Sequence, residues 1–272
     1  MTAEEMYNSL GEELKKDISF VSLVGSHNYY LSDVNSDYDF KIFVYPTFDD
    51  MFYSTRKTGI DVKIKGNDLK TTDIRQLKSV LTKSNINFIE VLFSDDIYIP
   101  SYNNTNLDKY NDDLIKFLFH NREKIAAMNI PHLVKAVSSS SLHRMNSFVH
   151  GGDYKSASQA YKEMWMLIRY LQFKDKKDDN AFLKAIKFDD SETIRQIYFN
   201  IRDKKLSKEE ITDILFSLQE NMNEIVDKIL GLWKEIPKDS AINFALDIAI
   251  KKAVKNRIYD QLYADHQKDL KK

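Results

Sequence analysis

The sequence predicts an α+β fold, in which an N-terminal mixed sheet with flanking helices precedes an all-α half. Three observations lead to this prediction. Short segments of strand character alternate with amphipathic segments over about the first hundred residues. Beyond them, long segments repeat apolar residues at the i, i+3, i+4 spacing of helices. Gly and Pro number only 7 and 4 among 272 residues, so long helices and few tight turns are expected.

Three segments of the first hundred residues are typical of strands. The apolar run ISFVSLV, residues 18–24, predicts a buried strand that ends at a glycine. The aromatic and β-branched run YDFKIFVY, residues 38–45, predicts a second strand, and Pro46 ends it. Residues 60–65 alternate apolar and polar side chains, which predicts a third, half-buried strand. Residues 72–83 have helical spacing instead.

Helical patterns account for most of the remaining chain. Thr2 and Glu5 form a capping box, which predicts a first helix as far as about residue 16. A polar, turn-rich stretch after residue 100 indicates a boundary, with residues 1–105 in one domain and residues 106–272 in a helical domain. Six helices are expected there, over residues 107–128, 131–149, 153–174, 191–204, 207–236 and 240–272.

Composition limits the classes of function that are open to the chain. Hydrophobic residues make up 43% and charged residues 30%, as in globular proteins that fold in water. The net charge of −1 provides no overall attraction to nucleic acid or to a membrane surface. The absence of Cys excludes disulfides, thiolate metal sites and Cys nucleophiles. Because no signal peptide and no membrane-length apolar run is visible, we expect a cytoplasmic protein without a membrane partner.

Two aspartates mark the start of the second predicted strand. Side chains alternate along a strand, so Asp37 and Asp39 are expected to point to the same side. If the strand of residues 60–65 pairs beside it, Asp61 faces that side as well. Carboxylates this close raise one another's pKa, and a hard divalent cation removes the conflict. Since Mg²⁺ prefers carboxylate and phosphate oxygens, the pattern predicts a magnesium site, with Mn²⁺ as an alternative ion.

Gly25 and Ser26 directly follow the first predicted strand. Backbone N–H groups and a hydroxyl at such a turn can hold a phosphate, and glycine permits a close approach. Phosphate donors beside metal-binding carboxylates predict a metal–nucleotide site, for which nucleotidyl transfer is the fitting reaction. A solvated, Asp-rich turn is the alternative explanation for Asp37 and Asp39, and a strand in contact with water is the alternative for Asp61.

The stretch GSHNYYLSDVNSDYDF, residues 25–40, resembles the DNA polymerase β-like nucleotidyltransferases. More narrowly, it is similar to the predicted nucleotidyltransferase family associated with RNA ligases, whose signature has the form G-S-[RH]-x-Y-G-x-x-x-x-x-S-D-x-D. NINFIEVLFS, residues 85–94, resembles that family's N-x-N-x-x-E-x-L-F segment, and YKEMWMLIRYL, residues 161–171, resembles its second-domain helix. The chain departs from the signature at Tyr30, where the family has a second Gly.

The resemblance implies roles for the residues of this motif. Asp37 and Asp39 would bind both metal ions of the catalytic site. Asp61 would complete one metal site and help to deprotonate the attacking hydroxyl. Gly25 and Ser26 would hold the β- and γ-phosphates of the nucleotide.

Three further residues are candidates for nucleotide binding. His27 follows the Gly-Ser pair, where it is placed to reach a phosphate or a base; a residue that only shapes the turn is the alternative. Lys162 and Arg169 lie two helical turns apart and therefore on one helix face. From there they would compensate charge as pyrophosphate leaves, and a solvated helix face is the alternative.

The sequence thus predicts a Mg²⁺-dependent nucleotidyltransferase that moves a nucleoside monophosphate from a nucleoside triphosphate to an acceptor hydroxyl or phosphate. Pyrophosphate would be released. RNA, a protein side chain and a small molecule are the acceptors considered. The alternative is a catalytically silent module that senses nucleotides or binds a partner, as a regulatory or antitoxin-like protein does. The complete set of carboxylates favours the enzyme.

Overall fold

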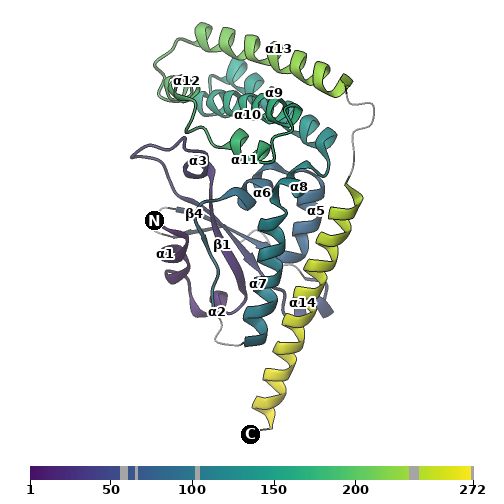
Figure 1. Cartoon of the computed structure of the whole chain (residues 1–272). Coiled ribbons are helices and arrows are strands. Elements are labelled where there is room, and N and C mark those ends of the chain that lie inside the picture. The colour runs from purple at the N-terminus through teal and green to yellow at the C-terminus, as the bar shows by residue number, and fades with distance from the viewer. Residues whose placement is uncertain (56–60, 65–66, 102–104, 233–238, 271–272) are drawn as a thin grey trace.

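The computed structural model describes residues 1–55, 61–64, 67–101, 105–232 and 239–270. The fold is α+β, as the sequence predicts: a mixed sheet lies in the N-terminal part, and helices make up the rest. A layer of helices is stacked on one end of the sheet layer (Figure 1).

The sheet of the described chain has five strands in the order β3-β4-β2-β1-β5. β2 pairs antiparallel with β1 and parallel with β4, while β5 and β3 add antiparallel edges. The three predicted strands appear as β1 to β3, with ends within two residues of those expected; residues 60 and 65 lie outside the described part. The strands are β1 (Ile18–Val24), β2 (Asp39–Val44), β3 (Asp61–Ile64), β4 (Asn67–Asp73) and β5 (Ile97–Tyr98).

β4 is not expected from the sequence, and it changes the arrangement of the acidic residues. Its sequence NDLKTTD is mostly polar, yet Thr71 and Thr72 are buried in the sheet. β4 lies between β2 and β3, so the strand of Asp61 does not pair with the strand of Asp39. The condition under which the sequence places Asp61 beside Asp39 is therefore not met. Asp61 pairs with Lys70 of β4, which in turn pairs with β2.

The two faces of the sheet contact different layers. Phe40, Ile42 and Val44 of β2 pack in a small core with α1 (Ala3–Asn8). Phe43 has the opposite parity and belongs to the large core that continues into the helical layer. Because side chains alternate on a strand, Asp39 has the parity of Phe43 and is on the side of the sheet that carries the cleft.

The N-terminal part contains several short helices. The predicted capping box of Thr2 and Glu5 is present, but the expected first helix is divided into α1 and α2 by a turn at residues 9–11. The other short helices are α2 (Glu12–Lys15), α3 (Gly25–Asn28), α4 (Phe48–Phe52), α5 (Leu77–Thr82), α6 (Ile86–Ile89), and the 3-10 helices η1 (Ile74–Gln76) and η2 (Glu90–Phe93).

The long helices follow the predicted segments closely. The segment 107–128 forms two helices instead of one, with a turn at Asn121, whose side chain donates to the Phe117 carbonyl at 2.9 Å. α11 is an additional short helix. The helices are α7 (Thr105–His120), α8 (Arg122–Ala127), α9 (Ile130–Gly151), α10 (Tyr154–Asp175), α11 (Ala181–Ile186), α12 (Glu192–Arg202), α13 (Lys208–Leu232) and α14 (Ser240–Asp269).

The helices that follow residue 105 lie in two places: most of them form the helical layer, while α7 and α14 lie against the sheet layer. α10 is the centre of the helical layer and packs against α9, α11, α12 and α13. α7 and α14 instead run side by side along the sheet layer (Figure 1). Asn111 of α7 is buried against the sheet, where its amide donates to the Ser19 carbonyl at 2.8 Å and its oxygen accepts from the Tyr45 hydroxyl at 3.0 Å. The two halves of the chain therefore share one core.

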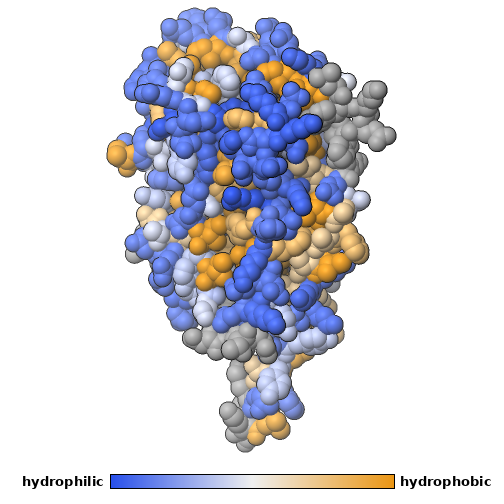
Figure 2. Space-filling model, viewed as in Figure 1, coloured by the Kyte–Doolittle hydropathy of each residue, from blue (hydrophilic) through white to orange (hydrophobic). Residues whose placement is uncertain are grey.

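The surface in the view of Figure 2 is largely hydrophilic, with separate hydrophobic patches between the charged areas. Within the described residues, no helix combines the length and the apolar character that crossing a membrane requires.

Candidate active site

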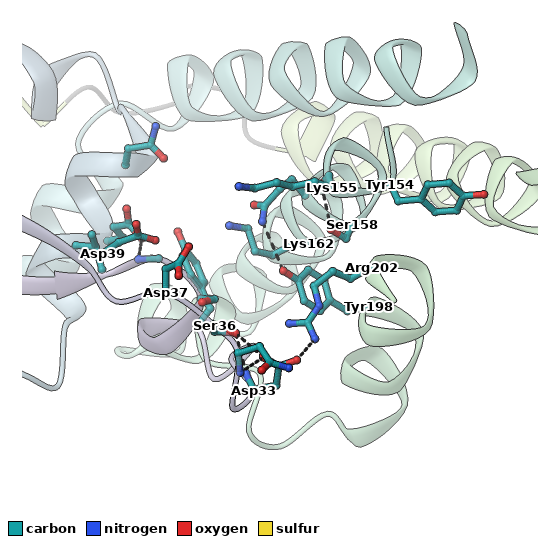
Figure 3. Close-up of a pocket in the computed structure, with 18 of the residues that line it drawn as sticks. Asp33, Ser36, Asp37, Asp39, Tyr154, Lys155, Ser158, Lys162, Tyr198 and Arg202 are labelled. Carbon is teal, nitrogen blue, oxygen red and sulfur yellow. Dashed lines mark hydrogen bonds and ion pairs between the residues drawn. The ribbon is translucent and has the colours of Figure 1, made fainter. Parts of the chain in front are cut away.

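A cleft of about 1290 Å³ is lined by residues from both the sheet layer and the helical layer. One wall comes from the end of β1, the loop before β2 and the start of β2. The opposite wall comes from the N-terminal half of α10 and the end of α12 (Figure 3). Five residues that the sequence singles out line this cleft: Gly25, Ser26, Asp37, Asp39 and Lys162.

Gly25 and Asp39 are in direct contact. Val24 pairs with Asp39 across β1 and β2, so the carboxylate lies beside the turn that begins at Gly25. Gly25 has a φ of +72°, and a Cβ at this position would overlap the Asp39 Oδ2 atom. Glycine is required for both reasons, because other residues avoid this φ and would displace the carboxylate. The turn and the acid are therefore built as one unit.

Asp37 lies in the loop immediately before β2, and its side chain is exposed. It lines the same cleft as Asp39, and Figure 3 shows both carboxylates at the same wall. The structure thus brings the two aspartates and Ser26 together.

The strand order decides which strand lies next to Asp39. Asp61 is the first residue of β3, two strands from β2, and its side chain lies outside the described part. β4 is the direct neighbour of β2, and Leu69 pairs with Phe40. Asp68 and Asp39 precede these two residues, so Asp68 is closer to Asp39 in register than Asp61 is. Among the described side chains, no three His, Asp or Glu residues are grouped to hold a metal ion.

A buried ion pair forms the floor of the cleft next to Asp39. The Lys41 amine donates to Glu90 Oε1 at 3.2 Å and also to the Asn87 carbonyl. Only 9% of the Lys41 side chain and 5% of the Glu90 side chain are exposed. Glu90 is the acid of the N-x-N-x-x-E-x-L-F segment, but sequence reasoning assigned it no role.

Glu90 also contacts the glycine turn. Its Oε2 atom accepts from the Gly25 N–H at 3.4 Å, and its main-chain carbonyl accepts from the Asn28 amide at 3.1 Å. The Gly25 N–H therefore already has an acceptor within the protein. Ser26, the other predicted phosphate ligand of this turn, lines the cleft.

Lys162 enters the cleft from α10 on the opposite wall. Its amine lies 4.1 Å from the centroid of the Tyr29 ring, and it forms no ion pair with any described carboxylate. Burial lowers the pKa of the Lys162 amine, while the negative charges of Glu90 and Glu163 act in the opposite direction. Figure 3 shows Lys155 and Lys162 both reaching from α10 toward the wall of the aspartates.

His27 supports the loop before β2 and is not among the residues that line the cleft. Its ring stacks on Tyr38 with the centroids 4.0 Å apart, and its Nε2 atom lies 3.2 Å from the Ser36 carbonyl oxygen. Of the two readings that the sequence left open, this position corresponds to the residue that shapes the turn.

Arg169 does not reach the cleft either. Its guanidinium donates to the carbonyls of Lys184 and Lys187 at the end of α11 and pairs with Asp190 at 2.8 Å. Arg169 shares a helix face with Lys162 but lies two turns further along α10. At that point the helix packs against the α11 segment instead of lining the cleft. Its position is that of a structural arginine, which departs from the expected contact with a triphosphate.

Tyr30 occupies the position at which the resembling family has glycine. It has a φ of +58°, a conformation that aromatic residues rarely adopt. Its hydroxyl donates to Asp95 at 2.6 Å, and this hydrogen bond raises the pKa of Tyr30 to about 12. The Lys187 amine donates to the same carboxylate at 2.6 Å and to the Asn28 carbonyl at 2.8 Å. These contacts hold the unusual turn against the helical layer.

The helical wall contributes residues that the sequence did not single out. Tyr198 and Arg202 come from α12, and Ser158 comes from α10. Arg202 pairs with Asp33 and so joins α12 to the loop before β2 (Figure 3). On the sequence these are ordinary polar positions of amphipathic helices, and only the packing of α10 and α12 brings them to one cleft.

Comparison with models of known protein families and with curated proteins gives no match for this chain. The function must therefore be inferred from the cleft itself.

Proposed function

We propose that the protein transfers a nucleoside monophosphate from a nucleoside triphosphate to an acceptor hydroxyl or phosphate, with release of pyrophosphate. The observation that carries this proposal is the contact of Gly25 with Asp39 at a cleft that Asp37, Ser26 and Lys162 also line. Carboxylates, a glycine turn and a cation in one cleft are the groups that bind a metal–triphosphate complex.

Asp37 and Asp39 would hold the divalent ions, Mg²⁺ or Mn²⁺. The donors available at this wall are carboxylate and hydroxyl oxygens, and the chain has no Cys, so the site suits a hard cation. Bound ions would neutralise negative charge on the phosphates as the reaction proceeds. Asp61 is the third carboxylate that the resemblance implies, and Asp68 is favoured as an alternative by its place in the strand order.

The triphosphate would lie between the two walls. The Ser26 hydroxyl would donate to a phosphate oxygen on the side of the sheet, while the Lys162 amine would approach from α10. Lys162 forms no ion pair with a carboxylate of the described residues, and a partly buried cation of this kind is favourable when a ligand brings negative charge. The cleft also exceeds the roughly 300–1,000 Å³ of ordinary small-molecule pockets, which leaves room for an acceptor beside the nucleotide.

A labelling experiment tests this function. The protein is incubated with Mg²⁺, each α-labelled nucleoside triphosphate in turn, and RNA, protein and small-molecule fractions of a cell extract. We expect label in one fraction together with released pyrophosphate. Asp37→Asn combined with Asp39→Asn should lower the rate at least about a thousandfold, because the ions lose their ligands. Asp112→Asn, an exposed change on α7, is the matched control and should transfer label normally.

Two results would contradict the proposal. If the protein binds a nucleotide and transfers label to none of the fractions, a nucleotide-sensing module is favoured instead. If the doubly substituted protein transfers label as fast as the native one, these aspartates are not the metal ligands.

A further inference from the structure

We propose that Tyr29 is a positioning residue for Lys162: its ring holds the ammonium group at the cleft and leaves the positive charge to a phosphate of the ligand. The inference rests on the proposed function, because that function assigns Lys162 to the triphosphate. Tyr29 follows the glycine turn and Lys162 lies on α10, so their contact joins the two walls of the cleft.

The Tyr29 ring has a fixed place between the glycine turn and the helical layer. Tyr29 directly follows α3, and its N–H donates to the Gly25 carbonyl at 3.2 Å. Its own carbonyl accepts at 3.2 Å from the N–H of Phe188, which follows α11. Only 2% of Tyr29 is exposed, and its side chain belongs to the large core. Contacts from both layers therefore fix the ring.

Lys162 presents its amine to this ring instead of to an acid. The amine lies 4.1 Å from the ring centroid, within the roughly 6 Å over which the face of an aromatic ring attracts a cation. Within the described part of the chain, the amine has neither an ion pair nor a hydrogen bond. An ammonium group has three N–H donors, so these donors are left for a ligand or for water.

Two acids act on the Lys162 amine through their charge but have other partners. Burial lowers the pKa of this amine, and the charges of Glu90 and Glu163 oppose the change. Glu90 pairs with Lys41 at 3.2 Å, and Glu163 pairs with Arg144 at 3.0 Å. The surrounding negative charge thus favours the protonated amine without occupying its N–H groups.

The physical consequence is a cation that is held in place and still available. A carboxylate partner would neutralise Lys162, and a phosphate would then have to displace it. An aromatic face attracts the charge but offers no oxygen to the N–H groups. A side chain that already has its position also loses less conformational entropy when a ligand binds. Because Ser26 and Tyr29 belong to one turn, the ring places Lys162 relative to the Ser26 hydroxyl.

A double-mutant cycle between Tyr29 and Lys162 tests this inference. The probe is inorganic tripolyphosphate with Mg²⁺, which carries no base, and its affinity is measured by isothermal titration calorimetry. Tyr29→Phe keeps the ring and should stay within about twofold of the native affinity, whereas Tyr29→Leu removes it and should weaken binding about tenfold. Lys162→Met should weaken binding at least about tenfold. The double variant Tyr29→Leu, Lys162→Met should lie within about twofold of Lys162→Met alone.

A spectroscopic measurement on the ligand-free chain tests the contact itself. Protons over the face of an aromatic ring resonate upfield, and the ε-protons of Lys162 are observed in a chain with ¹³C-labelled lysine. Their absence in Lys162→Met assigns them. We expect the upfield shift in the native chain and in Tyr29→Phe, and its loss in Tyr29→Leu. If Tyr29→Leu does not fold, the native chain and Tyr29→Phe still decide whether the ring holds the amine.

A matched variant controls for the loss of a buried ring. Phe182 of α11 is fully buried in the same large core and is not among the residues that line the cleft. Phe182→Leu should therefore change neither the ε-proton shift nor the affinity for tripolyphosphate. Circular dichroism and urea unfolding establish that each variant is folded.

The outcomes separate this inference from the proposed function. Additive losses in the cycle would overturn it, since Tyr29 would then act independently of Lys162. Native affinity in Tyr29→Leu, or ε-protons of Lys162 without an upfield shift in the native chain, would overturn it too. In all three cases a weakened Lys162→Met still supports the triphosphate site. Native affinity in Lys162→Met instead contradicts the proposed function, and the inference falls with it.

Discussion

Gly25→Ala is expected to abolish nucleotidyl transfer and to lower the free energy of unfolding by about 2–4 kcal/mol. At a φ of +72° an alanine is strained, and its Cβ would overlap the Asp39 Oδ2 atom. The turn and the carboxylate cannot both keep their places. Urea unfolding measures the loss of stability, and the labelling assay measures the loss of transfer.

Two glycines elsewhere in the chain separate the causes of this effect. Gly152 has nearly the same φ, +71°, but a Cβ there would meet nothing within 4 Å. Gly152→Ala therefore measures the backbone strain without the overlap, and about 1 kcal/mol of lost stability is expected. Gly231 of α13 has open space and no positive φ, so Gly231→Ala should be neutral or stabilising. Native transfer in Gly25→Ala would show that the contact with Asp39 is not needed.

Arg169→Met is expected to lower the free energy of unfolding by about 2–4 kcal/mol. The guanidinium is buried and satisfies the carbonyls of Lys184 and Lys187 where α11 ends. A methionine leaves these acceptors without their donor. It also loosens the segment from which the Lys187 amine reaches the Asn28 carbonyl beside the glycine turn.

The same variant distinguishes a structural arginine from a ligand of the nucleotide. Lys184→Met removes an exposed charge of α11 and should cost less than about 1 kcal/mol. With stability measured by urea unfolding, we expect Arg169→Met to bind the triphosphate with an affinity that follows its folded fraction. Full native stability combined with weak triphosphate binding would restore the role that the sequence suggested.

The local part of the site could be predicted from the sequence, because its residues are close along the chain. β1, the glycine turn and β2 are consecutive along the chain, so the antiparallel pairing of β1 with β2 places Asp39 beside the turn by a short-range rule. Asp37 lies in the loop directly before β2, where alternation along a strand does not apply. Asp61 could not be placed in this way. β4 separates its strand from β2, and a strand as polar as NDLKTTD gives little periodic signal.

Long-range packing explains the rest of what the sequence did not reveal. Helical spacing shows which face of α10 is apolar, but it does not show which turn faces the cleft, and Arg169 lies beyond the turn that does. Glu90 lies in the segment NINFIEVLFS, but its side chain contacts Lys41 and Gly25, which are far away in the sequence. The segment alone therefore does not reveal these contacts. At Tyr30 this turn carries a side chain at positive φ, and its hydroxyl bonds to Asp95, a contact that local sequence patterns do not reveal.

A crystal structure with Mn²⁺ and a nonhydrolysable nucleoside triphosphate is the most direct test of the central claim, that the cleft binds a metal–nucleotide complex. Anomalous scattering locates the ions independently of the rest of the density. We predict Mn²⁺ peaks within coordination distance of the Asp37 and Asp39 carboxylates and a triphosphate between Ser26 and Lys162. Ions bound elsewhere, or an analogue that leaves this cleft empty at saturating concentration, would contradict the account.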